Sequence, residues 1–356
     1  MGIAEVASAV DEIPLWTGVR RACPSGCEED LVLDPTANVP VDLGNDVFCI
    51  DTRMSGYDGI TSAYLIRSER PCLVETGTAT SANVVRDALS QLGLSPHDLS
   101  TIVVTHIHLD HAGGTGDVAR LYPQARVVVH ERGARHLVDP ERLMASARRV
   151  FGSVLDDVFG PLLPTPADRV DTIGSSGPVD LGSGRTLDAF HSPGHASHHL
   201  GLLDSATGDL YVGDAAGVYV PEIDTLRPAT PPPDFDLEQA LTSIRSFAER
   251  RPTRLLFSHF GPVDDVPTML ERAEDELRVW VELVRETRLS ELDLDHAVQR
   301  VTERTADRYA AYLADPSIEE KFEHLSATAA NVAGINRWLD QVEGVQVARS
   351  DPASLR

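Results

Sequence analysis

The chain has 356 residues, an apolar fraction of 42% and a net formal charge of −24, from 55 acidic and 31 basic residues. This length accommodates two domains, and the apolar fraction is ordinary for a protein with a full-sized core. Proteins that bind nucleic acid usually present a basic surface, so the acidic charge argues against nucleic acid as a partner. No stretch approaches the ~20 apolar residues of a membrane span, and the N-terminus lacks the features of a signal peptide. We therefore expect a cytoplasmic protein that binds neither nucleic acid nor membrane.

The four cysteines are Cys23, Cys27, Cys49 and Cys72. Cys23 and Cys27 form a CPSGC motif, which could begin a metal site or a disulfide. Cys49 and Cys72 lie in strand-like runs and are typical of small buried apolar residues. We expect free thiols in a reducing compartment.

The first half of the chain alternates strand and helix patterns after an irregular extension over residues 1–45. A helix is predicted over 81–94, with Ser81 as its N-cap and Gly93 at its end. A second, largely helical region follows from 131 to about 160. Short β-branched or apolar runs predict strands at 46–50, 62–66, 72–76, 101–105 and 125–130.

The second half repeats this alternation and then changes character. Strands are predicted at 185–192, 199–204, 209–214 and 254–259, with a helix at 236–250 and a proline-rich loop at 220–236. The alternation indicates a layered α/β domain over 46–265 with polar residues at the strand ends.

Amphipathic helical patterns fill the remainder, from 266 to 356. They cover residues 268–289, 294–314 and 317–342. We expect an all-helical C-terminal domain that either caps the site or forms a homodimer interface, with a slight preference for the interface.

Histidine and aspartate residues follow four of the predicted strands. The first group is THIHLDH, which contains His106, His108, Asp110 and His111. Alternate residues of an extended segment share one side, so His106 and His108 can face one ion while Asp110 and His111 face another. The motifs HSPGHASHH, YVGDAAG and LFSHFGP end the later strands. So many imidazole and carboxylate groups are costly to bury without a partner, so the first group is either a solvated polar turn or a cation site.

These motifs together resemble the metallo-β-lactamase superfamily, over about residues 46–262, and its glyoxalase II-like or lactonase-like branch in particular. The resemblance implies a four-layer αββα sandwich with the metals at one edge. It implies that His106, His108 and His195 bind a first metal. It further implies that Asp110, His111 and His259 bind a second metal, and that Asp214 bridges the two.

The chemistry of these side chains agrees with the resemblance. Imidazole and carboxylate ligands without thiolate suit Zn²⁺, and also Fe or Mn. We expect two Zn²⁺ ions per chain, which would lower the pKa of a shared water to about 7. Asp110 is the expected catalytic carboxylate, because it could orient the nucleophile and pass a proton to the leaving group.

Several neighbours of the expected ligands are interpreted as supporting residues or bystanders. His199 matches a second histidine of glyoxalase II-like relatives and is interpreted as supporting a ligand. Glu75 stands in VETG where most relatives carry an aspartate that orients a ligand histidine. Gly113 and Gly114 are expected to allow a tight turn into a helix. Two further histidines are interpreted as bystanders, His191 and His198.

The expected reaction is hydrolysis of an ester, thioester or lactone bond in a small-molecule substrate. Lactonases of this branch carry a tyrosine where this chain has Gly217, so Tyr219 is the nearest candidate for a substrate contact, with a core or wall residue as the alternative. Arg227 is a candidate contact to a carboxylate or phosphate, with a surface arginine as the alternative. Rival interpretations are a persulfide dioxygenase-like oxidoreductase with one iron, a phosphodiesterase, and a non-catalytic metal-binding scaffold.

Overall fold

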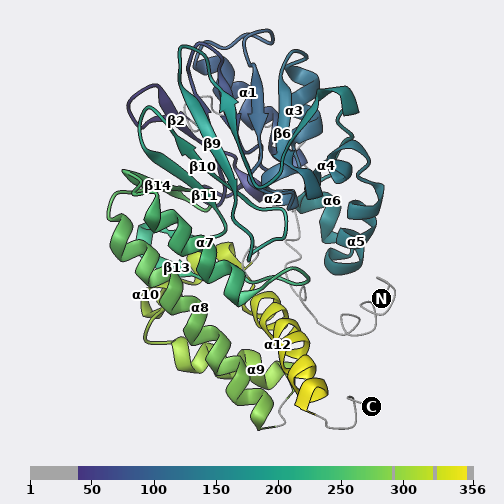
Figure 1. The fold of residues 1–356 in the computed structure, drawn as a ribbon, viewed down its shortest axis with the longest axis vertical. Coiled ribbons are helices and arrows are strands. Elements are labelled where there is room, and N and C mark those ends of the chain that lie inside the picture. The colour runs from purple at the N-terminus through teal and green to yellow at the C-terminus, as the bar shows by residue number, and fades with distance from the viewer. Residues whose placement is uncertain (1–38, 291–292, 324–326, 351–356) are drawn as a thin grey trace, which may run out of the picture.

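The computed structural model describes residues 39–290, 293–323 and 327–350. Two β-sheets pack face to face with helices on both outer sides, which gives a four-layer αββα sandwich (Figure 1). The fold class expected from the sequence is therefore confirmed. Most of the expected N-terminal extension, including Cys23 and Cys27, lies outside the described residues.

The first sheet contains seven strands in chain order. Its parallel half joins β4, β5, β6 and β7, so their carboxyl ends share one edge of the sheet. The strands are β1 (Val41–Asp42), β2 (Val47–Asp51), β3 (Ser62–Ile66), β4 (Cys72–Val74), β5 (Thr101–Val103), β6 (Arg126–His130) and β7 (Val170–Ile173).

The second sheet has six strands in the order β15-β14-β11-β10-β9-β8. Strands β11 and β14 run parallel, so Asp214 and His259 follow neighbouring strands at one edge. The strands are β8 (Ser176–Asp180), β9 (Thr186–His191), β10 (Leu200–Asp204), β11 (Asp209–Gly213), β14 (Arg254–Phe257) and β15 (Gly261–Val263).

Apolar side chains explain why the two sheets stack. On β2, Val47 and Cys49 point between the sheets, whereas Phe48 and Ile50 point toward the outer helices. Strands buried on both faces read as continuous apolar runs, which is why they were predictable. Cys49 and Cys72 are buried free thiols, as expected.

Six helices belong to the first half of the sandwich. Helix α1 ends near Gly93, whose φ of +86° suits glycine, so that boundary is confirmed. Ser81 stands at the N-cap, but its hydroxyl bonds Thr78 and not the helix. The helices are α1 (Ala82–Gln91), α2 (Leu109–Ala112), α3 (Thr115–Leu121), α4 (Glu131–Val138), α5 (Glu141–Phe151) and α6 (Val154–Val158).

The remaining helices cover the second sheet and extend beyond it (Figure 1). Helix α8 begins at Val266, next to the predicted domain boundary, and shares one apolar core with α7 and the second sheet. The helices are α7 (Leu237–Glu249), α8 (Val266–Leu289), α9 (Leu294–Thr305), α10 (Ala310–Ala314), α11 (Pro316–Glu323) and α12 (Thr328–Ser350). In the described ranges, none of the helices is both long and apolar enough to span a membrane.

The prediction of a loop over 220–236 was wrong for its first part. A hairpin occupies this region, formed by β12 (Val218–Val220) and β13 (Thr225–Arg227). Three-residue strands give too little alternation to be seen in a sequence. The rest of the segment is a loop that runs from Pro228 to helix α7.

Candidate metal centre

Four strand ends deliver the seven residues expected to bind metal. The turn after β5 carries His106 and His108, and the short helix α2 carries Asp110 and His111. The second sheet supplies the other three residues from the ends of β9, β11 and β14, namely His195, Asp214 and His259. All seven meet at one edge of the sandwich, where three overlapping sets of three side chains could each hold a metal ion. Two of the sets share no residue and are called the first and second groups below, and the third combines Asp214 with His106 and His111.

Gly113 and Gly114 allow the close packing that this arrangement needs. They join α2 to α3 with ordinary negative φ angles. A Cβ atom on Gly113 would lie 2.2 Å from the Leu109 carbonyl oxygen, and one on Gly114 would lie 2.9 Å from the Thr76 carbonyl oxygen. Glycine is required here for close backbone approach and not for a left-handed turn.

The first group is made of three imidazoles. Nε2 of His106 lies 3.1 Å from Nδ1 of His108. Nε2 of His195 lies 3.2 Å from Nε2 of His106 and 3.0 Å from Nδ1 of His108. The three nitrogen atoms therefore converge on one point.

The second group combines two imidazoles and a carboxylate. Nε2 of His111 lies 3.1 Å from Nε2 of His259. Oδ2 of Asp110 lies 3.5 Å from Nε2 of His111 and 3.3 Å from Nε2 of His259. Asp110 is 16% exposed whereas His111 is 1% exposed, so this carboxylate is the member nearest to solvent.

Asp214 lies between the two groups and presents one oxygen to each. Oδ1 lies 3.3 Å from Nε2 of His111 and 3.5 Å from Nε2 of His259. Oδ2 lies 3.6 Å from Nε2 of His195. Oδ1 is buried and receives no hydrogen bond from the described residues. This is the arrangement that a bridging carboxylate requires.

The hydrogen bonds of the histidine rings show that a cation fits. His195 donates its Nδ1–H to the Ala229 carbonyl, at 3.0 Å, and His259 donates its Nδ1–H to the Ile60 carbonyl, at 2.8 Å. A carbonyl oxygen can only accept, so in the neutral form of each ring, the form that binds a metal, Nε2 carries a lone pair directed at the other groups of the site. Ligand atoms at about 2.1 Å from a tetrahedral zinc lie about 3.4 Å apart. The observed separations of 3.0 to 3.6 Å match that spacing.

The electrostatics of the two groups differ. Burial lowers the pKa of His108 and of His195 to about 4, so both rings are neutral and can bind a metal. Burial also acts on His111 and His259, but the carboxylates of Asp214 and Asp110 outweigh it. They raise the pKa of His259 to about 9 and that of His111 well above its usual value. The second group is thus built to hold positive charge.

His199 and Glu75 accept hydrogen bonds from groups at or next to the candidate ligands. Nε2 of His199 accepts the backbone N–H of Asp214 at 3.2 Å, and its Nδ1 bonds Ser192 at 2.9 Å. Oε1 of Glu75 accepts the backbone N–H of Thr105 at 3.2 Å and the hydroxyl of Ser258 at 3.3 Å. It lies 3.8 Å from Nδ1 of His111. Glu75 therefore contacts the residues that precede two ligands more closely than it contacts a ligand ring.

Tyr219 lies on β12, beside the turn after β14 that carries His259. Its backbone N–H donates to the His259 carbonyl, and its carbonyl accepts the N–H of Phe260. Its hydroxyl donates to Oδ1 of Asp224 at 3.2 Å, which also binds Arg272. Its side chain thus contacts Asp224 of the hairpin and the ring of Phe257 on β14, with ring centroids 5.8 Å apart.

The alternative of a surface arginine was wrong for Arg227, which is 2% exposed. Its guanidinium contacts Glu323 at 2.9 Å, the Tyr312 hydroxyl at 2.7 Å and the Thr328 hydroxyl at 2.7 Å. A buried arginine needs such partners, and the residues that supply the two hydroxyls lie 85 and 101 positions away in the chain.

Of the bystander histidines, His198 packs beside the first group while His191 lies farther out. His198 stacks on the ring of His106, with centroids 6.3 Å apart. His191 stacks on His130 and bonds the Ser197 carbonyl.

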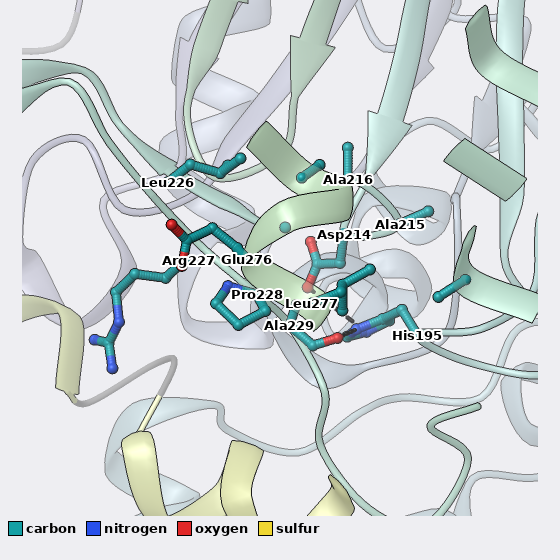
Figure 2. A pocket seen from close by; sticks show the side chains of 13 residues that line it. His195, Asp214, Ala215, Ala216, Leu226, Arg227, Pro228, Ala229, Glu276 and Leu277 are labelled. Carbon is teal, nitrogen blue, oxygen red and sulfur yellow. Dashed lines mark hydrogen bonds and ion pairs between the residues drawn. The ribbon is translucent and has the colours of Figure 1, made fainter. Parts of the chain in front are cut away.

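A small cavity of about 10 Å³ lies behind Asp214 and His195, with room for about one water molecule. Figure 2 shows both side chains on one wall and Glu276 and Arg227 toward the other. The Arg227 guanidinium points away from the cavity. The small residues that line the cavity are Ala215, Ala216, Gly217, Ala229, Ala240 and Ala273.

Sequence reasoning missed the groups that hold the ligand rings in place. The carbonyls of Ile60 and Ala229 are backbone atoms, so no residue type marks them in a sequence. Asn331, which contacts the loop after Ala229, lies a hundred residues away from it.

Comparison with known proteins agrees with this geometry. Residues 56–259, more than half of the chain, match the family model of the metallo-beta-lactamase superfamily. A metallo-beta-lactamase fold-containing protein of Sulfurisphaera tokodaii is 29% identical over 190 residues, which cover 51% of this chain and 70% of that protein. An N-acyl homoserine lactonase of Agrobacterium fabrum is 32% identical over 180 residues, which cover 49% of this chain and 61% of the lactonase.

A solved structure also resembles this chain, and the resemblance extends beyond the segment that the family model matches. The crystal structure of a metallo-beta-lactamase family protein from Thermus thermophilus superposes with a TM-score of 0.60 at 21% identity. The superposition covers 85% of this chain and 95% of that one, which supports the fold. The family model and the assembled seven-residue site together establish that this chain belongs to the metallo-β-lactamase superfamily.

Proposed function

We propose that the protein is a dinuclear metallohydrolase that cleaves an ester, thioester or lactone bond in a small-molecule substrate. The observation that carries the proposal is Asp214, whose two oxygens face two separate groups of metal-binding side chains. The first group would be His106, His108 and His195. The second would be Asp110, His111 and His259. Zn²⁺ is the proposed metal, because all the side chains are imidazole or carboxylate, with Fe and Mn as the alternatives.

Two bound metals would supply a nucleophile at neutral pH and polarise the carbonyl that is attacked. The chain's own residues supply the proton transfer. Asp110 is the most solvent-exposed of the two carboxylates at the site, at 16% against 6% for Asp214. Its carboxylate accepts a proton from the attacking water and then donates that proton to the leaving oxygen or sulfur. His199 and Glu75 keep the supporting backbone fixed during this transfer.

The similarity to an N-acyl homoserine lactonase supports a carbonyl substrate of the ester or lactone class. The acidic chain, at −24, gives no support to a phosphodiesterase that must bind polyanionic nucleic acid. The two buried free thiols, Cys49 and Cys72, support a reducing cytoplasmic location. A homodimer formed through the helical segment remains part of the proposal.

A panel of ester, thioester and lactone substrates tests the proposed reaction. The Zn²⁺-loaded protein should hydrolyse at least one class, and Asp110→Asn should lower kcat by about 10²–10⁴-fold. Asp188→Asn, on the exposed face of β9, is the matched control and should leave kcat unchanged. Absence of hydrolysis across the panel, or oxygen consumption with a persulfide by an iron-loaded protein, would contradict the proposal and favour an oxygenase.

A further inference from the structure

Helix α12 contacts the loop that fixes the ring of His195. The Ala229 carbonyl accepts the Nδ1–H of His195 at 3.0 Å. The next residue, Thr230, donates its backbone N–H to Oδ1 of Asn331 at 2.6 Å, and its hydroxyl donates to the Asn331 carbonyl at 3.1 Å. Asn331 lies in the first turn of α12 and is 2% exposed. The carbonyl that accepts from the His195 ring and the N–H that donates to the C-terminal helix therefore belong to one peptide group, between Ala229 and Thr230.

Gly334 brings the helix and the loop into backbone contact. A Cβ atom at this position would lie 1.9 Å from the Thr230 carbonyl oxygen, 2.8 Å from the Pro231 carbonyl carbon and 2.9 Å from the Pro232 nitrogen. These neighbours are all backbone atoms, which cannot rotate away. Only glycine allows this approach, and one turn later Arg337 bonds the Pro233 carbonyl at 3.3 Å.

The helix itself is firmly seated. Val332, Ile335 and Leu339 are fully buried in the core shared with α8 and α9. Trp338, on the side that meets the loop, packs edge-to-face on Phe235 with centroids 6.1 Å apart. A loop that packs on a rigid helix positions a metal ligand more precisely than a loop that is exposed to solvent.

We infer that Asn331 and Gly334 of helix α12 are positioning residues for the first metal group, acting on His195 through Thr230 and Ala229. The inference rests on the proposed metal site. The C-terminal helix is accordingly an integral part of the catalytic centre. It sets the tautomer and orientation of His195, and thereby the affinity of the group that contains His106 and His108.

The same coupling must act in both directions. If docking of α12 strengthens metal binding by some factor, metal binding strengthens docking of α12 by that factor. The amide protons of residues 331–339 should therefore exchange more slowly with solvent in the metal-loaded protein than in the apo-protein.

The matched pair Gly334→Ala and Gly344→Ala tests the inference. Both replace a glycine in the same helix by alanine, but a Cβ on Gly344 would meet nothing within 4 Å. The first measurement uses the apo-protein labelled with ¹⁵N-histidine and follows solvent exchange of the His195 Nδ1–H proton by NMR. The His259 Nδ1–H proton, which donates to Ile60 and not to the α12-supported loop, is the internal reference.

Gly334→Ala should speed exchange of the His195 proton by about 10-fold or more and leave the His259 proton unchanged. Titration with Zn²⁺ against a competing chelator should then show about 10–100-fold weaker binding of one of two ions. Gly344→Ala should match the wild type in both measurements. Asn331→Ala should reproduce the effect if Gly334→Ala fails to fold, as judged by circular dichroism.

Unchanged exchange of the His195 proton and unchanged Zn²⁺ affinity in folded Gly334→Ala and Asn331→Ala proteins would overturn the inference. A wild-type protein that binds no metal would instead contradict the proposed function. The exchange measurement on the apo-protein would still decide whether α12 positions His195, so the two failures are distinguishable.

Discussion

Oδ1 of Asp214 lies 3.3 Å from Nε2 of His111, and Oδ2 of the same carboxylate lies 3.6 Å from Nε2 of His195. A single side chain thus lies between candidate metal ligands that come from both sheets of the sandwich. A substitution of this residue therefore affects both candidate metal groups.

Asp214→Asn is therefore expected to weaken metal binding at both groups. The amide keeps the size of the side chain but loses the charge and one acceptor oxygen. Metal content measured by mass spectrometry should fall from about two ions per chain to below one, with loss of turnover. Asp188→Asn, an exposed carboxylate on β9, should keep the wild-type content. Full metal content and activity in Asp214→Asn would mean that this residue does not bridge.

Tyr219→Phe is expected to leave metal content unchanged, because its hydroxyl bonds Asp224 and none of the seven metal-binding side chains. The kinetic parameters decide its role. A fall of about 10-fold or more in kcat/KM on the true substrate would support contact with the substrate. If kcat/KM stays at the wild-type value, Tyr219 serves only the hairpin and the backbone pairing with His259.

Arg227→Ala is expected to destabilise the protein by about 3 kcal/mol, the scale for removing hydrogen bonds to a buried charged group. The substitution leaves Glu323, the Tyr312 hydroxyl and the Thr328 hydroxyl without this partner. The measurement is the free energy of unfolding in denaturant. Arg70→Ala removes an exposed pair with Asp180 and should change that free energy by no more than about 0.5 kcal/mol. Equal effects of the two substitutions would refute a structural role for the buried arginine.

The Arg227–Glu323 pair also predicts a pH dependence of stability. Burial acts to raise the pKa of Glu323, but Arg227 and Thr328 outweigh it and hold that pKa below its usual value. The stabilisation is therefore present above pH ~4.5 and is lost as pH falls through the lowered value. The Tm difference between the wild type and Glu323→Gln should be constant near neutral pH and shrink in acid. A difference that grows as pH falls would contradict this sign.

The sequence was most informative where candidate metal ligands lie close together in the chain or directly follow a buried strand. His106, His108, Asp110 and His111 lie within six positions, and together with the later motifs they indicated a metal site. His195, Asp214 and His259 each follow a buried strand, so their place at one edge could be expected from the resemblance. The buried strands of both sheets were predictable from their apolar runs.

The supporting structure was less predictable, for physical reasons. Strands β7 and β8 are partly exposed and carry no continuous apolar run, and the hairpin β12–β13 is too short for alternation to show. The sequence around Arg227 suggested a surface residue, because its partners, such as Glu323, lie in a helix that is distant in the chain. The support of His195 by Ala229 and Asn331 depends on backbone atoms and on tertiary contact.

The most direct test of the two-metal account is the metal content of protein purified without chelators, measured by mass spectrometry of the intact chain and by elemental analysis. We expect about two ions per chain, predominantly zinc, released together by a strong chelator and restored with activity on addition of Zn²⁺. A single iron per chain, with the second group left empty at saturating metal, would contradict the dinuclear hydrolase.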